Sequence, residues 1–387
     1  MTKLPKRILF ARAADLSNLN AQAKNVQYIL RHWKSQEYKP SVVAFSTPDP
    51  RVAANPNVEV LHLRNDRLWR VALFALYMRG FDAVFCPGLH YIADWLALKT
   101  RALLGHRLVV ISTVEGLLAG EADRSNEQLY ASVAGHEVHC QTVPQPILRR
   151  AEAIDEMADH IIAISPFLAR LATSRYGSKV STLPLGVDKA MFVRSGWNRR
   201  TRPRVIGAGT VGPRKRPQLF IKLARIFPQA DFVWYGEGEL RASLQAEAAH
   251  GGLSNIEFPG AVDPEVLARE FTASDIFILP SLAEGVPKVT QEAAAAGLAQ
   301  IIFGFYEAPT VRDGVNGFVV WNDDELVPRL GQMLKDPDMV AKMGRAGVEM
   351  ATAWSWDIVA PQWEQRIIGV LEGGNLAKQD RDSPLAS

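Results

Sequence analysis

The chain has 387 residues, of which 48% are hydrophobic and 22% are charged, which is ordinary for a globular protein with sizeable cores. No uninterrupted apolar run approaches the roughly 20 residues that span a bilayer, and the first residues lead into a short strand rather than a signal peptide, so we expect a cytoplasmic protein. Two cysteines, Cys86 and Cys140, are too few for a metal cluster and indicate no oxidising compartment.

Charge is unevenly distributed along the chain. Residues 1–200 hold 26 Lys and Arg against 17 Asp and Glu, whereas the remainder holds 18 against 24. A basic half favours an anionic partner, and a membrane surface, a lipid phosphate and a nucleic acid are the candidates. The basic residues are scattered and form no helix-turn-helix or aromatic RNA-binding motif, so we expect no nucleic acid.

The first part of the chain alternates strands with helices, which predicts right-handed crossovers and a parallel sheet. The expected strands are residues 7–11, 41–45, 58–62, 82–86, 108–112 and 160–164, and the expected helices are 21–33, 92–104, 148–157 and 166–176. Residues 180–183 lead into a predicted turn at 185–188. Residues 67–79 mix arginines with apolar side chains. That pattern is equally typical of a core helix and of a basic amphipathic helix on a membrane.

Several polar side chains follow these strands. Ser17, Asn18 and Asn20 are helix-capping residue types, with the lining of a cleft as the alternative. Glu115 places a carboxylate at the carboxyl edge of the sheet, where open α/β sheets bind ligands. Residues 120–143 have no clear period. Within them His136, Glu137 and His139 look metal-like, but a third ligand is missing and the spacing is wrong for a zinc helix, so we expect no metal there.

A second βα series follows residues 193–203, which are charged, aperiodic and interrupted by Gly and Pro, as is typical of a linker. We therefore predict domains at 1–192 and 204–357, with a last helix at 358–371 that crosses back to complete the first domain. The polar tail, 374–387, is predicted to be disordered. The expected strands of the second domain are residues 204–208, 231–235, 256–258, 276–279, 299–303 and 317–320.

Residues 276–297 predict a buried strand, a tight loop that holds Glu284, and a helix that holds Glu292. Such a loop presents backbone N–H groups and the positive end of a helix dipole, which favour a pyrophosphate. Glu292 would accept hydrogen bonds from two ribose hydroxyls, and Glu284 would face the group that the phosphate carries. A pair of solvated acids is the alternative for these two residues alone.

Six motifs in register decide between these alternatives. They are Gly207-Ala-Gly209 with Pro213-Arg214-Lys215, Tyr235-Gly-Glu-Gly238, Phe258-Pro-Gly260, Ala273-Ser-Asp275 with Leu279-Pro-Ser281, the glutamates at 284 and 292, and Asp313-Gly-Val-Asn-Gly-Phe318. In order and spacing they resemble the nucleotide-sugar glycosyltransferases of family 4. The resemblance spans nearly the whole chain and implies an α/β fold of GT-B architecture, with two Rossmann-like doubly wound domains facing a central cleft.

The resemblance also implies site residues. Glu284, Lys215 and Glu115 would be catalytic, with Lys215 neutralising phosphate charge. Gly260 and Ala261 would hold the base through main-chain contacts, and Ser17, Asn18 and Asn20 would lie on the acceptor side. Breaking a sugar–diphosphate bond leaves negative charge that cations and helix N–H groups stabilise, so we expect neither a metal nor another cofactor. The residues expected to bind the donor are Glu292, Gly285, Val286, Lys288, Val289, Thr210, Arg214, Gly209, Gly260 and Ala261.

Three positions depart from the family pattern. Thr210 stands where an arginine is common, with Arg214 or Arg216 as its substitute, and Glu115 stands where many members carry a histidine. Pro287 replaces a frequent glycine and contributes no N–H donor. Asn322-Asp-Asp324, although acidic, is predicted to cap a helix rather than to bind a metal.

The function implied by the resemblance is that of a retaining hexosyltransferase. It would move a sugar from a UDP- or GDP-sugar to a hydroxyl of a glycan or lipid-linked glycan in bacterial surface polysaccharide assembly, a role that rests on family analogy. Peripheral contact with an anionic membrane, at the inner face of the plasma membrane, stays open. Two alternatives are a catalytically silent GT-B protein that binds a nucleotide sugar for a partner enzyme, and a GT-B nucleotide-sugar epimerase or phosphorylase.

Overall fold

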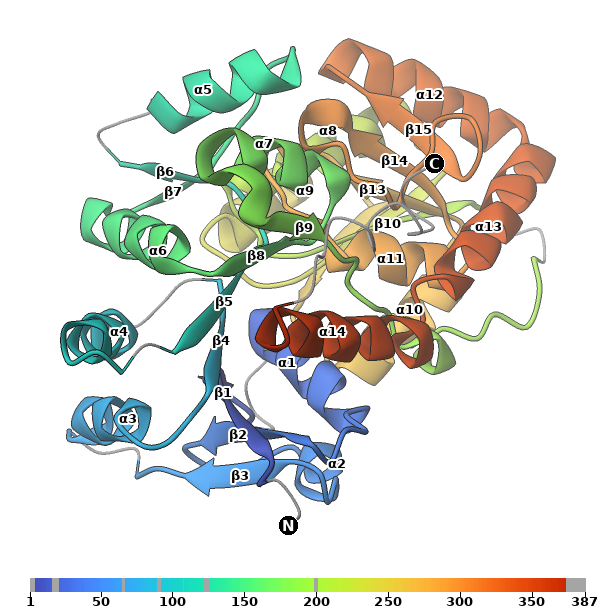
Figure 1. Cartoon of the computed structure of the whole chain (residues 1–387). Coiled ribbons are helices and arrows are strands. Elements are labelled where there is room, and N and C mark those ends of the chain that lie inside the picture. Colours follow the sequence, from blue (N-terminus) through green and yellow to red (C-terminus); the bar gives the residue numbers. More distant parts are fainter. Residues whose placement is uncertain are drawn as a thin grey trace. The chain divides into compact units, whose positions relative to one another are not determined.

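The protein is represented by a computed structural model, which describes residues 4–15, 21–64, 67–88, 92–106, 108–121, 125–197 and 201–373 (Figure 1). Contacts divide the chain into two compact units. Unit 1 is Met1–Gly135, Cys140–Gly186 and Trp356–Ser387, and unit 2 is His136–His139 and Val187–Ser355. The predicted acceptor-side residues Ser17, Asn18 and Asn20 lie outside the described residues, as does the predicted tail, 374–387.

Unit 1 is built on a seven-stranded parallel sheet in the order β3-β2-β1-β4-β5-β8-β9. Its central strands are almost wholly buried, as expected for a parallel sheet covered on both faces. The seven strands include all six predicted ones, with ends that differ by a few residues, and β9, which was not predicted. They are β1 (Lys6–Ala13), β2 (Tyr38–Ala44), β3 (Glu59–His62), β4 (Ala83–Pro87), β5 (Val109–Val114), β8 (His160–Ala163) and β9 (Val180–Thr182).

Helices cover both faces of this sheet. Figure 1 shows α3, α4 and α6 along one face, and α1 and α14 on the other. The last helix, α14, belongs to unit 1, and its Trp363 donates from Nε1 to the Pro184 carbonyl at 2.8 Å. The helices of unit 1 are α1 (Ala21–Arg31), α2 (Pro50–Ala53), α3 (Trp69–Tyr77), α4 (Ile92–Leu103), α5 (Ser125–Ala134), α6 (Gln145–Met157), α7 (Pro166–Tyr176) and α14 (Trp356–Leu371).

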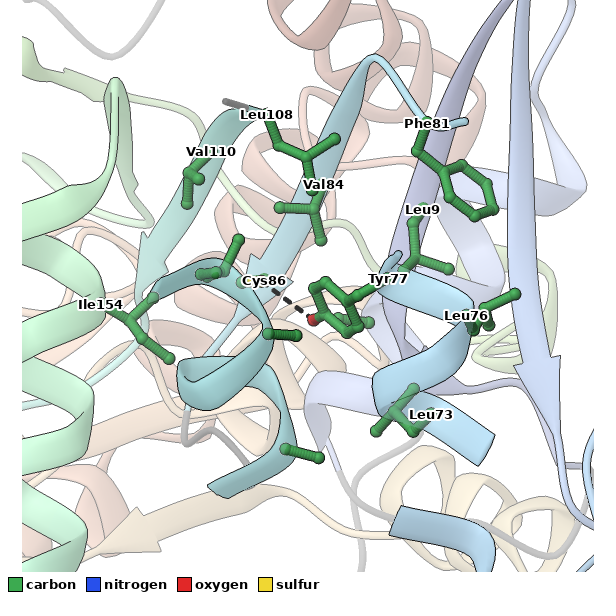
Figure 2. Packing of buried hydrophobic residues seen from close by; sticks show 14 of the residues in the cluster. Leu9, Leu73, Leu76, Tyr77, Phe81, Val84, Cys86, Leu108, Val110 and Ile154 are labelled. Atoms are coloured by element: carbon green, nitrogen blue, oxygen red, sulfur yellow. Dashed lines mark hydrogen bonds between the residues drawn. The ribbon is translucent and has the colours of Figure 1, made fainter. Parts of the chain in front are cut away.

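The core of unit 1 lies between α3, α4 and the sheet. Figure 2 shows Leu73, Leu76 and Tyr77 of α3 packed toward β4, where Cys86 is fully buried. The Tyr77 hydroxyl donates to Asp94 at 2.9 Å and lies 3.7 Å from the Cys86 sulfur. Because Tyr77 is buried, its pKa is well above the ordinary value and the hydroxyl stays neutral. Cys86 and Cys140 are both buried, and they do not form a disulfide with each other.

The region without a sequence period contains a helix and a short strand pair. β6 (Leu118–Gly120) pairs with β7 (Gln141–Val143), and α5 lies between them in the sequence. In α5 the one buried residue is Tyr130, among those that the structure describes. A helix that buries a single side chain leaves no apolar stripe, which explains why its period is absent from the sequence.

Unit 2 is a six-stranded parallel sheet in the order β12-β11-β10-β13-β14-β15. Numbered within the unit this order is 3-2-1-4-5-6, that of dinucleotide-binding folds, and unit 1 repeats it with a seventh strand added. All six predicted strands are present. The strands are β10 (Arg204–Ala208), β11 (Asp231–Tyr235), β12 (Ile256–Gly260), β13 (Ile276–Leu279), β14 (Ala299–Phe303) and β15 (Gly317–Val320); the helices are α8 (Gln218–Ile226), α9 (Arg241–His250), α10 (Pro264–Thr272), α11 (Lys288–Ala295), α12 (Asp323–Lys335) and α13 (Pro337–Thr352).

The first residues of the predicted linker, 193–203, are hydrogen-bonded to unit 2 and do not form an exposed connection. Arg194 donates to the Ala296 carbonyl at 2.7 Å and to the Ser274 carbonyl. Trp197 donates to the Gly297 carbonyl at 3.1 Å. These carbonyls follow α10 and α11, so the first residues of the segment satisfy helix C-termini of unit 2. The main segment of unit 2 begins at Val187, five residues before the predicted end of the first domain at residue 192.

Across the described ranges, the search for a helix of sufficient length and apolarity to cross a membrane finds none.

Candidate active site

Two loops of unit 2 meet where its strand order reverses. β10 and β13 are adjacent, with Val205 aligned with Ile276. The loop after β10 passes through the 3-10 turn Pro213–Lys215, and the loop after β13 leads into α11. The Leu282 N–H donates to the Arg214 carbonyl at 3.0 Å and ties the loops together. This carboxyl edge is where open α/β sheets bind ligands.

A cluster of charged side chains joins these two loops. The Glu284 carboxylate accepts from the Lys215 ammonium at 2.6 Å, from the Arg214 guanidinium at 2.7 Å and from the Ser281 hydroxyl at 2.5 Å. The side chains of Lys215 and Glu284 are 10% and 11% exposed, whereas that of Arg214 is 36% exposed. The structure therefore brings the predicted residues Lys215, Arg214 and Glu284 together as one partly buried ion cluster.

The electrostatics of this cluster are set by burial. Burial lowers the pKa of Lys215, and the Glu284 carboxylate opposes that shift. Tyr306, which follows β14, is also buried, and its pKa is well above the ordinary value because of that burial and the negative charge of Glu284. Tyr306 therefore remains a neutral hydroxyl near the cluster. Sequence analysis missed it, since its only sequence signal is an aromatic residue shortly after a strand.

Glycines allow the loops after β10 and β11 to approach each other. Gly209 has φ of 136°, and a Cβ there would stand 3.2 Å from Cε of Lys215. A Cβ at Gly236 would lie 2.0 Å from the Gly209 carbonyl oxygen, and one at Gly238 would lie 2.3 Å from the Val211 carbonyl oxygen. The predicted glycine motifs thus provide backbone packing beneath Lys215.

Glu292 lies in the second turn of α11, next to Lys288 at the start of the helix. Among the described residues its carboxylate accepts no hydrogen bond. Burial raises the pKa of Glu292, and the Lys288 charge opposes the rise. Pro287 caps the helix with no side-chain hydrogen bond to the helical N–H groups that the structure describes. The predicted donor residues Gly285 and Val286 precede this cap, and Val289 follows Lys288.

The remaining predicted donor residues lie along the same edge. Thr210 is exposed beside Gly209. Gly260 ends β12 with φ of 98°, and a Cβ there would meet the Glu237 carboxylate at 2.5 Å. The Ala261 N–H donates to that carboxylate at 3.3 Å. The Ala261 N–H, which the family resemblance predicts to contact the nucleotide base, is therefore already bonded to the Glu237 carboxylate.

Arg216, a predicted substitute for the missing family arginine, has another partner. It has φ of 54°, and its guanidinium pairs with both oxygens of Asp323 at 2.6 and 2.7 Å. Arg214, which contacts Glu284, is the arginine in the cluster. Asn322 accepts a hydrogen bond from the Glu325 N–H at 3.0 Å, so the prediction that residues 322–324 cap a helix is confirmed.

Glu115, the third predicted catalytic residue, belongs to unit 1 and follows β5. It accepts hydrogen bonds from the Thr113 hydroxyl at 3.1 Å and from the Asn25 side-chain amide at 3.2 Å. These contacts hold its carboxylate at the carboxyl edge of the unit 1 sheet, as predicted from its place after the strand.

The histidine cluster, His136 to His139, makes contacts within unit 2. His136 lies 3.0 Å from the Glu307 carboxylate and 5.1 Å, between ring centroids, from Trp321. His139 packs edge-on against Phe305. Among the described residues, no group of three or more His, Cys, Asp or Glu side chains is arranged to hold a metal ion.

Comparisons with known proteins agree on one enzyme class. Residues 193–350 match the family model of the glycosyl transferases group 1. A GDP-mannose-dependent alpha-(1-6)-phosphatidylinositol monomannoside mannosyltransferase of Mycobacterium tuberculosis is 29% identical over 280 residues, which cover 65% of this chain and 71% of the relative. A D-inositol 3-phosphate glycosyltransferase of Streptomyces scabiei is 37% identical over 300 residues, 69% of this chain and 63% of the relative.

Solved structures share the fold over nearly the whole chain. Sucrose-phosphate synthase of Thermosynechococcus elongatus covers 95% of this chain and 100% of its own, with a TM-score of 0.72 and 18% identity. Anabaena Alr3699/HepE, solved in complex with UDP and glucose, covers 95% of this chain and 99% of its own, with a TM-score of 0.67 and 15% identity. Residues 193–350 therefore form a domain of the glycosyl transferases group 1, and the two Rossmann-like units give the chain the GT-B fold.

Proposed function

We propose that the chain transfers mannose from GDP-mannose, with retention at the anomeric carbon, to a hydroxyl of a lipid-linked glycan. The observation that carries this proposal is the ion cluster of Lys215, Arg214 and Glu284 at the carboxyl edge of unit 2. The choice of donor is supported by the relatives, which are named as GDP-mannose-dependent enzymes. A UDP-sugar is the other donor class, and a UDP complex of a structural relative represents it.

The cluster suits the departure of a nucleoside diphosphate. A lysine ammonium has three N–H donors, of which Lys215 uses one on Glu284, so others remain for a phosphate oxygen. As the bond from the anomeric carbon to the phosphate oxygen breaks, negative charge grows on the diphosphate. Lys215, Arg214 and the N-terminal amides of α11 would stabilise that charge in a partly buried site.

Retention follows in this proposal from attack on the face that the diphosphate leaves. The acceptor oxygen bonds to the anomeric carbon, the bond from that carbon to the phosphate oxygen breaks, and the acceptor proton passes to the diphosphate. Glu284 already accepts from Lys215, Arg214 and Ser281, which makes its carboxylate a weak nucleophile. A covalent sugar ester on Glu284 is therefore disfavoured, and Glu284 orients the cations instead.

The cations of the cluster also bear on metal dependence. Lys215 and Arg214 supply fixed positive charge at the place where a divalent ion would otherwise bridge phosphate oxygens. We therefore infer a reaction that needs no divalent metal. Turnover measured in excess EDTA should stay within about twofold of turnover in magnesium, since an essential metal would cost orders of magnitude.

The lipid part of the proposed acceptor is supported by the outer surface of α3 and α4. Leu68 and Val71, at the start of α3, are 66% and 62% exposed, and Leu103, at the end of α4, is 87% exposed. The inner faces of both helices are already packed into the core (Figure 2). α3 is thus apolar on both sides, whereas a helix on a protein surface has one polar face.

Basic side chains accompany this apolar surface. Arg67 is exposed just before α3, Arg70 is exposed in its first turn, and Lys99 is exposed on α4. Exposed aliphatic residues flanked by cations favour an anionic lipid surface over a protein groove or a neutral bilayer. Arg101 has a different role, because it donates to the Tyr77 and Arg79 carbonyls at 3.0 and 2.8 Å and joins the ends of the two helices.

Vesicle sedimentation tests this lipid contact. The protein should sediment with vesicles that contain 30% phosphatidylglycerol and stay in solution with pure phosphatidylcholine. Leu68→Ser with Val71→Ser should lower the bound fraction severalfold, whereas Val315→Ser, at an exposed valine of unit 2, should not. Equal binding by the double variant, or equal binding to neutral vesicles, would remove the membrane from the proposal.

Donor use is tested with the purified chain and a panel of nucleotide sugars. Nucleotide release is followed with and without a membrane extract as acceptor, and the product is analysed by NMR for its anomeric configuration. GDP-mannose should give the fastest acceptor-dependent release and an α-linked product. Faster release from a UDP-sugar would reassign the donor, and an inverted product would remove the retaining mechanism.

A further inference from the structure

The segment that leads into β10 holds the C-terminal end of α11, the helix that carries Glu292. Arg194 donates from Nε to the Ala296 carbonyl at 2.7 Å, and Trp197 donates from Nε1 to the Gly297 carbonyl at 3.1 Å. These two residues follow the last residue of the helix, where carbonyl groups have no intrahelical partner. Two side chains of the segment therefore supply the hydrogen bonds that the end of α11 lacks.

The Arg194 guanidinium also reaches the end of α10. Its Nη2 donates to the Ser274 carbonyl and, at 3.4 Å, to the Phe271 carbonyl. Phe271 is in the last turn of α10, and Ser274 follows the helix directly before β13. A positive charge at this position faces the negative ends of both helix dipoles. A single side chain thus joins the C-termini of the helices that precede and follow β13.

Close packing holds the end of α11 in this arrangement. Gly297 has φ of 72°, and a Cβ there would lie 2.9 Å from the Trp197 ring and 3.3 Å from Nε of Arg194. A Cβ at Gly344 of α13 would lie 2.3 Å from the Gly297 carbonyl oxygen and 2.7 Å from Nε1 of Trp197. The Gly297 carbonyl is therefore confined between α13 and the Trp197 indole.

The end of α11 is one turn away from Glu292. The Ala296 N–H donates to the Glu292 carbonyl at 2.9 Å, so the residue that Arg194 holds is bonded directly to the backbone of Glu292. The helix has eight residues, which is about two turns. A helix this short has little stability of its own and depends on contacts with its surroundings. The position of the Glu292 carboxylate should therefore depend on Arg194.

We propose that Arg194 is a positioning residue for the donor nucleotide, which holds α11 so that Glu292 meets the ribose hydroxyls. This inference rests on the proposed function and adds a residue that acts through Glu292 without touching the nucleotide. Lys215 and Arg214 lie in the loop after β10, and Arg194 makes no hydrogen bond to them among the described residues. The loss of Arg194 should therefore weaken ribose recognition and spare the contact with the diphosphate.

Calorimetry with GDP and 2′,3′-dideoxy-GDP tests this role, because only GDP has the ribose hydroxyls. The unmodified chain should bind GDP about 10- to 100-fold more tightly, the range for hydrogen bonds to a charged group. Arg194→Gln should reduce this ratio to below about threefold and change the Kd of dideoxy-GDP less than twofold. Arg194→Lys, which keeps the charge, should retain at least half of the ratio. The control is Arg345→Gln, since Arg345 lies over the Trp197 ring at 5.5 Å and makes no hydrogen bond to α11 among the described residues.

A merely structural role would lower both affinities by the same factor and leave the ratio unchanged. Circular dichroism shows which variants are folded, and Trp197→Phe, which removes only the Nε1 donor, should lower the ratio in the same direction if Arg194→Gln does not fold. An unchanged ratio in the folded variants would overturn this inference and leave the proposed function intact. If the unmodified chain binds UDP more tightly, the UDP pair replaces the GDP pair and only the proposed donor changes. Binding of neither nucleotide would overturn both.

Discussion

Unit 1 and unit 2 share a strand order and differ in charge at the carboxyl edge of the sheet. In unit 2, the cations Lys215 and Arg214 surround one carboxylate, Glu284. In unit 1, the carboxylates of Glu115, Glu152 and Asp155 outnumber the guanidinium of Arg175. In both units the strand order creates a ligand site at the carboxyl edge of the sheet. The side chains of the surrounding loops and helices determine the charge of that site. The difference favours a diphosphate on unit 2 and opposes one at the acidic edge of unit 1.

The largest effect is expected for Lys215→Met, which keeps the length of the side chain and removes its charge. Turnover should fall by about 10²- to 10³-fold, the range for loss of one group that stabilises transition-state charge. Steady-state GDP release measures it, with Lys222→Met on the exposed side of α8 as the matched control. A loss below threefold would mean that the cation cluster of unit 2 is structural, which would erase the contrast between the units.

Glu292→Ala should mainly affect donor affinity. Hydrogen bonds to a charged group contribute about 1.5–3 kcal/mol, so the Kd for GDP-mannose should rise by about 10- to 100-fold. Calorimetric titration of GDP-mannose measures this, and Glu349→Ala, an exposed glutamate of α13, is the control. If affinity for GDP-mannose were unaffected, the ribose would have to bind elsewhere than at α11.

Asp155→Asn tests the acidic edge through stability. Burial raises the pKa of Asp155 to about 6, while the Ser112 hydroxyl, Lys179, Tyr176 and Arg175 act in the opposite direction. The unfolded value is about 3.9, so the folded chain binds this proton more tightly, and its contribution to stability is present below about pH 4 and lost as pH rises through about 6.

The Asn variant lacks this titration. At pH 7.5 it should therefore be more stable than the unmodified chain, by an amount on the order of 2 kcal/mol, and the gap should shrink at pH 4.5. Urea unfolding at both pH values measures the difference, with the exposed Asp263→Asn as the control. If the stability difference did not depend on pH, Asp155 would be ionised at both pH values. The carboxyl edge of the unit 1 sheet would then carry more negative charge than inferred.

The smallest effect is expected for His139→Ala. The His139 ring packs edge-on against Phe305, and its Nε2 lies 3.3 Å from a carboxylate oxygen of Glu137. Turnover should change less than twofold, because the variant loses only the packing against Phe305 and one contact with an exposed carboxylate. If turnover were abolished, His139 would have a catalytic role, and the active site of unit 2 would include more than the cluster of Lys215, Arg214 and Glu284.

The strands of the two sheets could be predicted from the sequence, whereas the partners of individual side chains could not. Buried parallel strands are short apolar runs, so twelve of the thirteen strands of the two large sheets were predicted, all except the edge strand β9. The pairing of Lys215 with Glu284 joins residues 69 positions apart and has no local signal. A cavity in unit 1, lined by Tyr130, Asp155 and Arg175 among others, escaped prediction because these three residues lie on three different helices without a shared motif.

The fold and the motifs were also easier to predict than the contacts that individual side chains of the motifs make. Arg216 was a candidate for the cluster, yet its left-handed backbone and Asp323 draw its guanidinium elsewhere. Glu237 bonds to the Ala261 N–H that was expected to face a base. In both cases the deciding partner is distant in the sequence, and only the folded chain brings it near.

The glycines at 236 and 238 have a consequence for how this chain tolerates change. Each sits where an added Cβ would collide with a carbonyl oxygen of the neighbouring loop, at 2.0 and 2.3 Å. Because those oxygens are backbone, no rotamer change relieves the collision. In a saturation mutagenesis library scored for growth or activity, positions 236 and 238 would therefore tolerate substitution as poorly as a catalytic residue does. Intolerance there would report the spacing of two loops and should not be mistaken for contact with the sugar donor.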